Sequence, residues 1–232
     1  MTNFSCLQKT FFLLVIGGLC TLQACGNDDE ENNSLRELEN GNVLVNGHEA
    51  VDLGLSVKWA TCNVGAFSPE GYGGYYAWGE TKEKSDYTPM TYKYYLGDLD
   101  GDGYYYLDYE YANIGSSISG TQYDVARVKW GKSWRIPTRD EIEELLDGCT
   151  WKWTTYNGVN GQLITAPSGN SIFLPAAGIR EGTYLFDRAS RGLYWSATLD
   201  EDYIYNVYIF DFDNGINMLG RDYGLPIRPV TE

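Results

Sequence analysis

The chain has 232 residues, and its 32 acidic side chains outnumber its 17 basic ones, which gives a formal net charge of −15 at pH 7. A protein this acidic repels polyanions, so the composition argues against binding to nucleic acid or to anionic membrane surfaces. The length suits one domain with a substantial hydrophobic core once the polar N-terminal region is set aside.

The first residues predict export from the cytoplasm. Lys9 precedes an apolar run from Phe11 to Cys25, which fits a secretory signal peptide and is shorter than the about 20 apolar residues that span a bilayer. The run ends in Leu-Gln-Ala-Cys, which resembles the lipobox of bacterial lipoproteins. We therefore predict a signal peptide over residues 1–24 and lipidation of Cys25. The alternative is a cleaved signal with an incidental cysteine.

Residues 25–42 are expected to form a flexible, solvated tether. The stretch GNDDEENN that follows Cys25 is polar and acidic, and it contains no residue that a core would bury. Acidic residues directly after a lipidated cysteine resemble the surface-export signal of gut Gram-negative lipoproteins. This resemblance implies an outer-membrane lipoprotein at the cell surface that contacts the membrane only through its lipid. A single domain then covers residues 43–232.

Two cysteines remain in the predicted domain. Cys6 and Cys20 leave with the signal peptide, and Cys25 takes the lipid, so Cys62 and Cys149 are left as an even pair. Disulfides form in oxidising compartments, and we therefore predict a disulfide between these two residues. The alternative is a pair of buried thiols, because cysteine is often buried in any case.

The first part of the domain reads as short strands. In VLVNGHEAVDLGL, the Asn46-Gly47 pair is a strong hairpin-turn signal between two short strands. The stretches SVKWATCNVG and YGGYYAWGE follow as strands rich in tryptophan and tyrosine. Residues 81–120 are polar, acidic and rich in tyrosine, with little periodicity, and we interpret them as a long insertion or loop region.

This insertion contains the start of a calcium-loop motif. Asp98, Asp100 and Asp102 alternate before a glycine, which is the order of oxygen ligands and sharp turn that opens a twelve-residue calcium loop. The twelfth position is a tyrosine instead of a glutamate. A structural calcium site would therefore need further ligands from the carbonyl of Tyr104 and from Asp108 or Glu110. The alternative is an acidic, solvated loop.

Two helices are predicted in the middle of the chain. The first lies in TQYDVARVKWG, with Thr121 as its N-cap and Gly131 as its end. The second follows Thr138, which forms a capping box with Glu141, and it ends at Gly148. Its stripe of Ile142, Leu145 and Leu146 is expected to be buried.

The rest of the chain reads as a meander of strands. Turn signals stand at Asn157-Gly158, Asn160-Gly161 and Ser168-Gly169. In YIYNVYIFDFDNG neither set of alternating residues is cleanly polar, so both faces of this strand are expected to be partly covered. Strands, two helices and then more strands predict an α+β fold.

Several motifs in combination resemble a known family. These are VDLGLSVKWATCNVGA, YGGYYAWGET, WGKSWRIPTRDEIEELL, SIFLPAAG, YWSA and IRPV. Together they resemble the Fibrobacter-type major paralogous domain, which is related to the C-terminal domain of collagen-like bacterial adhesins. The resemblance implies a C-type-lectin-like fold, with two helices packed on irregular antiparallel sheets, in a surface lipoprotein.

The same resemblance implies scaffold roles for the large and basic side chains of the motifs. Four tryptophans are expected in the core: Trp59, Trp78, Trp134 and Trp195. Arg135 and Arg228 are expected to satisfy buried carbonyls or carboxylates, with an anion-binding pair as the alternative.

The sequence offers little for catalysis. His48 is the single histidine, it lies in a turn where we expect it to be exposed, and no nucleophile stands near it. Zinc ligands of the histidine and cysteine type are too few and too scattered. The stretch Trp195-Ser196-Ala197 lacks the residues with which animal C-type lectins bind sugar through calcium. We therefore predict a protein without enzymatic activity.

The favoured function is a surface-anchored, adhesin-like module that binds an extracellular glycan or protein. The alternatives are a structural envelope or pilus-associated component and, with less support, a carbohydrate-active enzyme. We expect the contacts on loops near the C-terminal strands, because a rigid sheet fixes the bases of such loops. Tyrosine there offers rigid, amphipathic contact area, and Asp, Asn and Arg add directional hydrogen bonds. The candidate ligand-binding residues are Tyr184, Asp202, Tyr203, Asn217, Arg221 and Tyr223.

Overall fold

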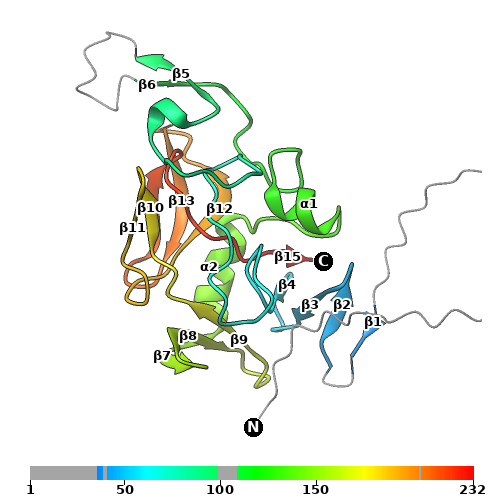
Figure 1. Cartoon of the computed structure of the whole chain (residues 1–232). Helices are drawn as coiled ribbons and strands as arrows, with labels where there is room; N and C mark the ends of the chain where they lie inside the picture. The colour runs from blue at the N-terminus through cyan, green and yellow to red at the C-terminus, as the bar shows by residue number, and fades with distance from the viewer. Residues whose placement is uncertain (1–35, 39–40, 99–108, 204) are drawn as a thin grey trace, which may run out of the picture.

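The computed structural model describes residues 36–38, 41–98, 109–203 and 205–232. The first sheet joins both ends of the described chain in the antiparallel order β1-β2-β3-β4-β15 (Figure 1). Its strands are β1 (Arg36–Glu37), β2 (Val43–Val45), β3 (His48–Val51), β4 (Lys58–Ala60) and β15 (Val230–Thr231). The predicted hairpin is confirmed, because Asn46 and Gly47 connect β2 to β3 with φ values of 47° and 81°. Positive φ at both residues matches the twist of the two strands.

The two predicted helices are present. Helix α1 (Val125–Trp130) begins later than expected, because the carboxylate of Asp124 accepts hydrogen bonds from the N–H groups of Ala126 and Arg127 and caps the helix in place of Thr121. Gly131, with a φ of 95°, ends it as predicted.

Helix α2 (Arg139–Gly148) confirms the predicted capping box. The Thr138 hydroxyl accepts from the N–H of Glu141 at 3.3 Å, and the Glu141 carboxylate accepts from the N–H of Thr138 at 2.8 Å. Ile142 and Leu145 are buried, and Leu146 is partly buried against the same cluster.

A three-stranded meander follows α2. Its strands are β7 (Thr150–Tyr156), β8 (Val159–Thr165) and β9 (Ser171–Pro175). Asn157 and Gly158 form the turn between β7 and β8, as the sequence predicts. The predicted turn at Asn160-Gly161 is wrong, because both residues lie inside β8. Gly161 is needed there for a different reason: a Cβ atom would collide with the carbonyl oxygen of Leu174 on β9.

The last strands form two further sheets. They are β10 (Ile179–Glu181), β11 (Tyr184–Phe186), β12 (Leu193–Leu199), β13 (Asn206–Asp211) and β14 (Gly215–Gly220), in the orders β10-β11 and β12-β13-β14. The central strand β13 is covered on both sides, since Val207 and Ile209 belong to one hydrophobic cluster and Phe210 to another. This confirms the expectation from its mixed pattern.

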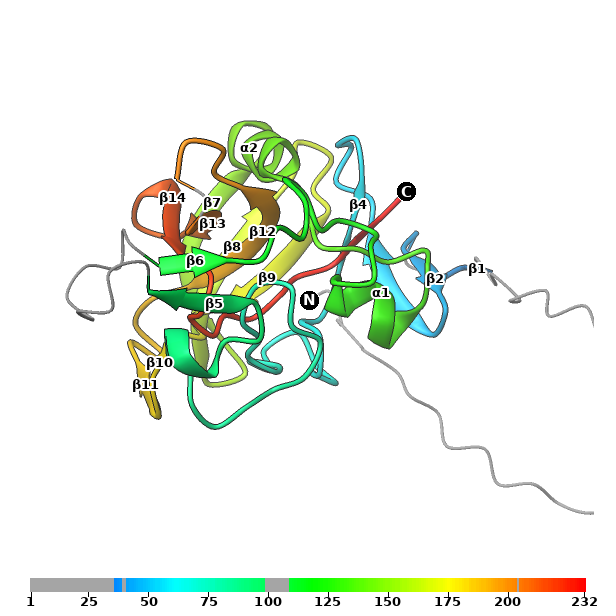
Figure 2. The same ribbon diagram turned by 90° about the horizontal axis from the view of Figure 1, so that it is seen from above.

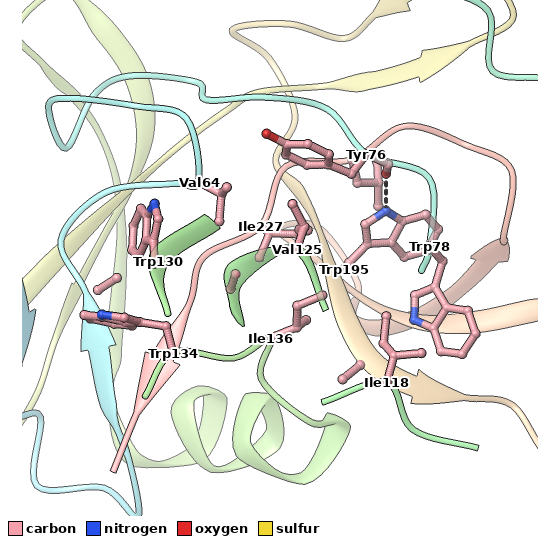
Figure 3. Packing of buried hydrophobic residues seen from close by; sticks show 14 of the residues in the cluster. Val64, Tyr76, Trp78, Ile118, Val125, Trp130, Trp134, Ile136, Trp195 and Ile227 are labelled. Atoms are coloured by element: carbon pink, nitrogen blue, oxygen red, sulfur yellow. Dashed lines mark hydrogen bonds between the residues drawn. The ribbon is translucent and has the colours of Figure 1, made fainter. Parts of the chain in front are cut away.

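Tryptophan side chains fill much of the hydrophobic core. Trp78, Trp134 and Trp195 belong to the cluster shown in Figure 3, and Trp59 belongs to the second cluster. All four are at most 2% exposed, which confirms that they are core residues. The indole N–H of Trp195 donates to the carbonyl oxygen of Tyr76 at 2.7 Å, so the buried ring keeps its polar atom satisfied.

The tyrosine-rich stretch that we interpreted as an insertion is partly core. It contains the 3-10 helix η1 (Pro89–Thr91) and the pair β5 (Tyr95–Asp98) and β6 (Tyr109–Tyr111). Tyr87, Tyr92 and Tyr111 are buried in a third hydrophobic cluster. The interpretation as a loop region is therefore wrong for these residues, because a tyrosine ring can be buried while its hydroxyl donates to a backbone carbonyl.

The predicted α+β class is also wrong. The described residues form fifteen strands, paired antiparallel, and only two α-helices of six and ten residues. The fold is predominantly β. The error lay in the weight given to the helices, because α1 loses its first turn to the late cap at Asp124 and both helices are short beside the strands that the sequence also predicted after α2.

Candidate ligand-binding pocket

Residues of β6, β10, β11 and β14 line a pocket of about 790 Å³. These four strands lie on the same side of the ribbon in Figure 2. Its wall is made of Tyr87, Thr88, Pro89, Tyr111, Glu181, Gly182, Tyr184, Phe186, Tyr205, Asn206, Met218, Leu219, Gly220, Asp222 and Tyr223. The volume lies within the range of pockets that hold small ligands or single side chains with their flanking groups.

Two distant parts of the chain build this pocket together. The backbone of Tyr87 is bridged to Gly182, with each N–H donating to the other residue's carbonyl oxygen at 2.8 Å. Gly224 then lies against the ring of Tyr87, where a Cβ atom would stand 2.5 Å from a ring carbon. Only glycine allows this approach, which brings the tyrosine-rich stretch against the C-terminal segment.

The rim of the pocket is aromatic and exposed. Tyr184 is 69% exposed, Phe186 44% and Met218 42%, although all three are large apolar or amphipathic side chains. The rings of Tyr184 and Phe186 lie 6.0 Å apart. Exposed apolar side chains that gather at one concave place, instead of scattering, are typical of interaction sites.

Two carboxylates add negative charge to the pocket. Glu181 is exposed, whereas Asp222 is only 7% exposed. Burial, assisted by the charge of Glu181, raises the pKa of Asp222 to about 6, although the backbone N–H of Asp222 and the ammonium group of Lys84 act in the opposite direction. That ammonium group donates to the carboxylate of Glu80 at 3.0 Å and to the carbonyl oxygen of Thr91 at 3.1 Å.

Tyr223 is an aromatic residue of the pocket wall that contacts one of the two carboxylates. Its hydroxyl donates to the Glu181 carboxylate at 3.4 Å, and burial together with this carboxylate raises its pKa to about 12. Tyr223 is therefore a neutral hydrogen-bonding group at physiological pH. The pocket can stack a ligand against its aromatic rings, accept hydrogen bonds on its carboxylates and attract positive charge.

The structure brings some of the predicted ligand-binding residues together and separates others. Tyr184 and Tyr223 line the pocket. Asp202, Tyr203 and Asn217 are exposed but lie outside its wall, although the ring of Tyr203 packs 5.7 Å from that of Tyr205, which does line it. These three residues are placed around the pocket and not in it.

Arg221 is the clearest correction to the predicted set. The side chain is 1% exposed, so it cannot reach a ligand at the surface. Its guanidinium lies 5.0 Å from the ring centroid of Trp78 and 5.2 Å from that of Tyr111, and it donates to the hydroxyl of Tyr92 at 3.2 Å. Arg221 therefore stabilises the packing of the aromatic side chains beneath the pocket.

Most residues of the pocket wall were not among the predicted ligand-binding residues. Tyr87, Tyr111 and Tyr205 come from segments or faces that were not selected, and Glu181 and Asp222 were also passed over. One sequence signal could have indicated part of this wall. Residues 81–120 are rich in tyrosine, which is unusual for a loop that is exposed to solvent. No local pattern shows that this stretch contacts the C-terminal strands.

The predicted calcium site lies mostly outside the described residues. Asp100, Asp102, Tyr104 and Asp108 fall in the undescribed segment, and only the backbone of Asp98 and the exposed Glu110 are described. Within the described ranges, no group of three or more His, Cys, Asp or Glu side chains is placed to hold a metal ion.

The predicted disulfide is not formed in this structure. Cys62 is a buried thiol in the first hydrophobic cluster, next to the hydroxyl of Thr61 at 3.6 Å, whereas Cys149 packs against the second cluster. The two residues belong to different parts of the core, and the alternative of a buried thiol fits Cys62, whereas Cys149 is only partly buried.

The predicted scaffold arginines satisfy polar groups, as expected. Arg228 is 1% exposed and donates to the carbonyl oxygens of Ala60, Thr61 and Phe173. Arg135 is bound to the Glu141 carboxylate at 2.6 Å. Both guanidinium groups are thereby engaged inside the scaffold.

The predicted signal peptide, the lipidation site Cys25 and most of the tether lie outside the described residues. The end of the predicted tether is not a flexible chain, because β1 (Arg36–Glu37) pairs with β2 and Asn42 is buried. No helix in the described part of the chain has the length and apolar character needed to cross a membrane. The comparisons with known proteins found no match: no protein family, curated protein or solved structure is similar to this chain.

Proposed function

We propose that this protein is a surface-anchored, adhesin-like module that binds an extracellular glycan or protein ligand through the pocket between β6, β10, β11 and β14. The observation that carries the proposal is the aromatic rim. Three of the nine exposed large hydrophobic side chains among the described residues, Tyr184, Phe186 and Met218, line one pocket that also holds two carboxylates. Leaving such side chains in water is unfavourable unless a partner covers them.

The anchor in this proposal is the lipid on Cys25. The lipobox-like sequence, the acidic tether and the resemblance to the Fibrobacter-type major paralogous domain support a lipoprotein of the outer membrane that faces the outside of the cell. The tether then separates the binding domain from the membrane, as an adhesin requires. The strongly negative charge fits a domain that does not lie on the anionic membrane surface.

Binding arrays test the proposal. The purified protein is applied to glycan and extracellular-protein arrays, and each hit is measured again with the variants Tyr184→Ala and Phe67→Ala. Both residues are exposed aromatics, at 69% and 74%, but only Tyr184 lines the pocket. Truncation of an exposed aromatic contact residue should weaken binding about tenfold or more, and the Phe67 variant should bind like the wild type.

The proposal fails if no ligand of either class binds. It also fails if the two variants weaken binding equally, since the aromatic rim would then have no special role. Polysaccharide turnover in the same samples would favour a carbohydrate-active enzyme.

A further inference from the structure

We propose that the pocket recognises a basic side chain of a polypeptide partner, with the cationic group between the carboxylates of Asp222 and Glu181 and the aliphatic stem along the aromatic wall. This inference rests on the proposed function and names the ligand chemistry. Arginine fits best, because its planar guanidinium both pairs with carboxylates and stacks on aromatic faces.

The charge of the wall supports a cation. The pocket is lined by two carboxylates, and no lysine, arginine or histidine stands among its described lining residues. The nearby Lys84 ammonium group is already held by Glu80 and by the carbonyl oxygen of Thr91. An incoming cation therefore meets net negative charge in the pocket, and the acidic protein as a whole attracts it.

The aromatic wall can contact the rest of the basic side chain. The tyrosine and phenylalanine rings of the pocket can stack on a guanidinium or cover an alkyl stem. The same pairing recurs within this chain, where Arg188 lies 4.3 Å from the ring centroid of Tyr72 and Arg180 lies 5.2 Å from that of Tyr75.

The flanking strands favour a polypeptide as the source of the cation. Tyr184 and Phe186 belong to β11, and Met218 and Leu219 belong to β14. Each of these strands is the terminal strand of its sheet in the described ranges. Its outer backbone groups can pair with an extended segment, except the N–H of Met218, which donates to Asn217 Oδ1 at 2.8 Å. A sugar cannot use these edges in the same way.

The state of Asp222 agrees with this reading. A carboxylate that is 7% exposed loses most of its hydration, which is why its pKa rises to about 6. At neutral pH the carboxyl group of Asp222 is nevertheless mostly ionised, so its burial destabilises the unliganded protein. A cation in the pocket offsets this penalty, which is the usual reason for a destabilised charge to persist at a binding site.

The test uses matched peptides. Acetyl-Ser-Arg-Ser-amide and its citrulline counterpart differ only in the charge of one side chain, and their affinities are measured by calorimetry at pH 7.5. The wild type is compared with Asp222→Asn and with Glu201→Gln, an exposed carboxylate that does not line the pocket. Glu181→Gln gives a second, exposed probe of the same charge pair.

We expect the wild type to bind the arginine peptide at least about tenfold more tightly than the citrulline peptide, because hydrogen bonds to a charged partner are stronger. Asp222→Asn should remove this preference and raise the melting temperature at pH 7.5, whereas Glu201→Gln should change neither. Glu181→Gln should reduce the preference.

Three results would overturn the inference. Equal affinities for the two peptides, or no binding of either, would exclude charge recognition. Tighter binding of a glucosamine oligosaccharide than of the arginine peptide would show that the pocket binds a cationic glycan and not a polypeptide. Binding of a neutral oligosaccharide that depends on Tyr184 but not on Asp222 would leave the proposed function intact while removing this inference.

Discussion

Arg221 carries a positive charge into the interior of this acidic protein. Its guanidinium lies among the rings of Trp78, Tyr92 and Tyr111 and donates to the carbonyl oxygen of Ala112 at 3.2 Å. The aromatic faces and the hydrogen bonds replace the water that the charge loses on burial. This residue therefore stabilises the packing below the pocket, and its removal should affect stability before binding.

We predict that Arg221→Ala lowers the free energy of unfolding by about 3–5 kcal/mol, because a cavity and lost hydrogen bonds replace a well-packed charge. The control is Arg188→Ala, which removes an exposed arginine that also stacks on a tyrosine and should cost about 1 kcal/mol or less. Urea denaturation measures both values. Equal losses in the two variants would show that the buried position of Arg221 has no special energetic weight.

His48 differs from the expectation of an exposed turn residue. Its imidazole stacks on the indole of Trp130 with ring centroids 3.7 Å apart and meets Trp134 edge to face. Burial in this aromatic contact lowers the pKa of His48 to about 4. As the pH falls, His48 is therefore protonated near pH 6.5 in the unfolded chain but only near pH 4 in the folded protein.

The consequence is a loss of stability in acid. The contribution of neutral His48 is fully present above pH 6.5, and it declines as the pH falls from 6.5 to about 4. We predict that His48→Phe, which keeps a ring against Trp130, gains about 2 kcal/mol relative to the wild type over this interval. Urea denaturation at pH 7.5 and 4.5 measures the difference. A histidine proton resonance that titrates near 6.5 in the folded protein would contradict the prediction.

At the scale of elements, the β5–β6 pair holds the two described ends of the predicted calcium segment side by side. Gly97 pairs with Glu110 and Asp98 with Tyr109, so the backbone positions of Asp98 and Glu110 meet at the same end of this hairpin. Calcium needs six to eight oxygen ligands, and residues from both strands can contribute to one shell only if the strands meet. This pairing makes the calcium site a hypothesis worth a direct measurement.

We predict that millimolar calcium raises the melting temperature of the protein by several degrees, because an ion that binds only the folded state stabilises it by mass action. The double variant Asp100→Asn, Asp102→Asn should lose this response, whereas Asp147→Asn, an exposed carboxylate on α2, should keep it. Calorimetric titration provides the affinity. No heat and no thermal shift in the wild type would identify the segment as an acidic loop.

At the scale of the whole molecule, the proposed anchor determines where the binding domain acts. We predict that Cys25→Ala abolishes acylation and releases the protein from the membrane fraction, because the acyl chains provide the stable membrane attachment. Cys20→Ala removes a cysteine from the same apolar run and should leave both properties unchanged. Metabolic labelling with a fatty acid and protease treatment of intact cells measure acylation and surface exposure. Labelled Cys25→Ala protein would disprove the lipidation site.

The sequence by itself determined the features that depend on neighbouring residues. Asn46 and Gly47 adopt positive φ values, and they close the predicted hairpin. Thr138 and Glu141 stand three residues apart, and their capping box needs only groups from this one turn. The four buried tryptophans were implied by the resemblance of their motifs to a known family and not by ring size alone, since Trp153 is 46% exposed.

The tertiary structure alone decided the class of the fold and the composition of the pocket. Neighbouring residues receive opposite roles: Arg221 points into the aromatic core, while Asp222 lines the pocket. Tyr87 reaches the same pocket only because its backbone pairs with Gly182, far along the chain. Such contacts depend on strand register and on close approaches at single glycines such as Gly224, and no pattern within a short window of sequence encodes them.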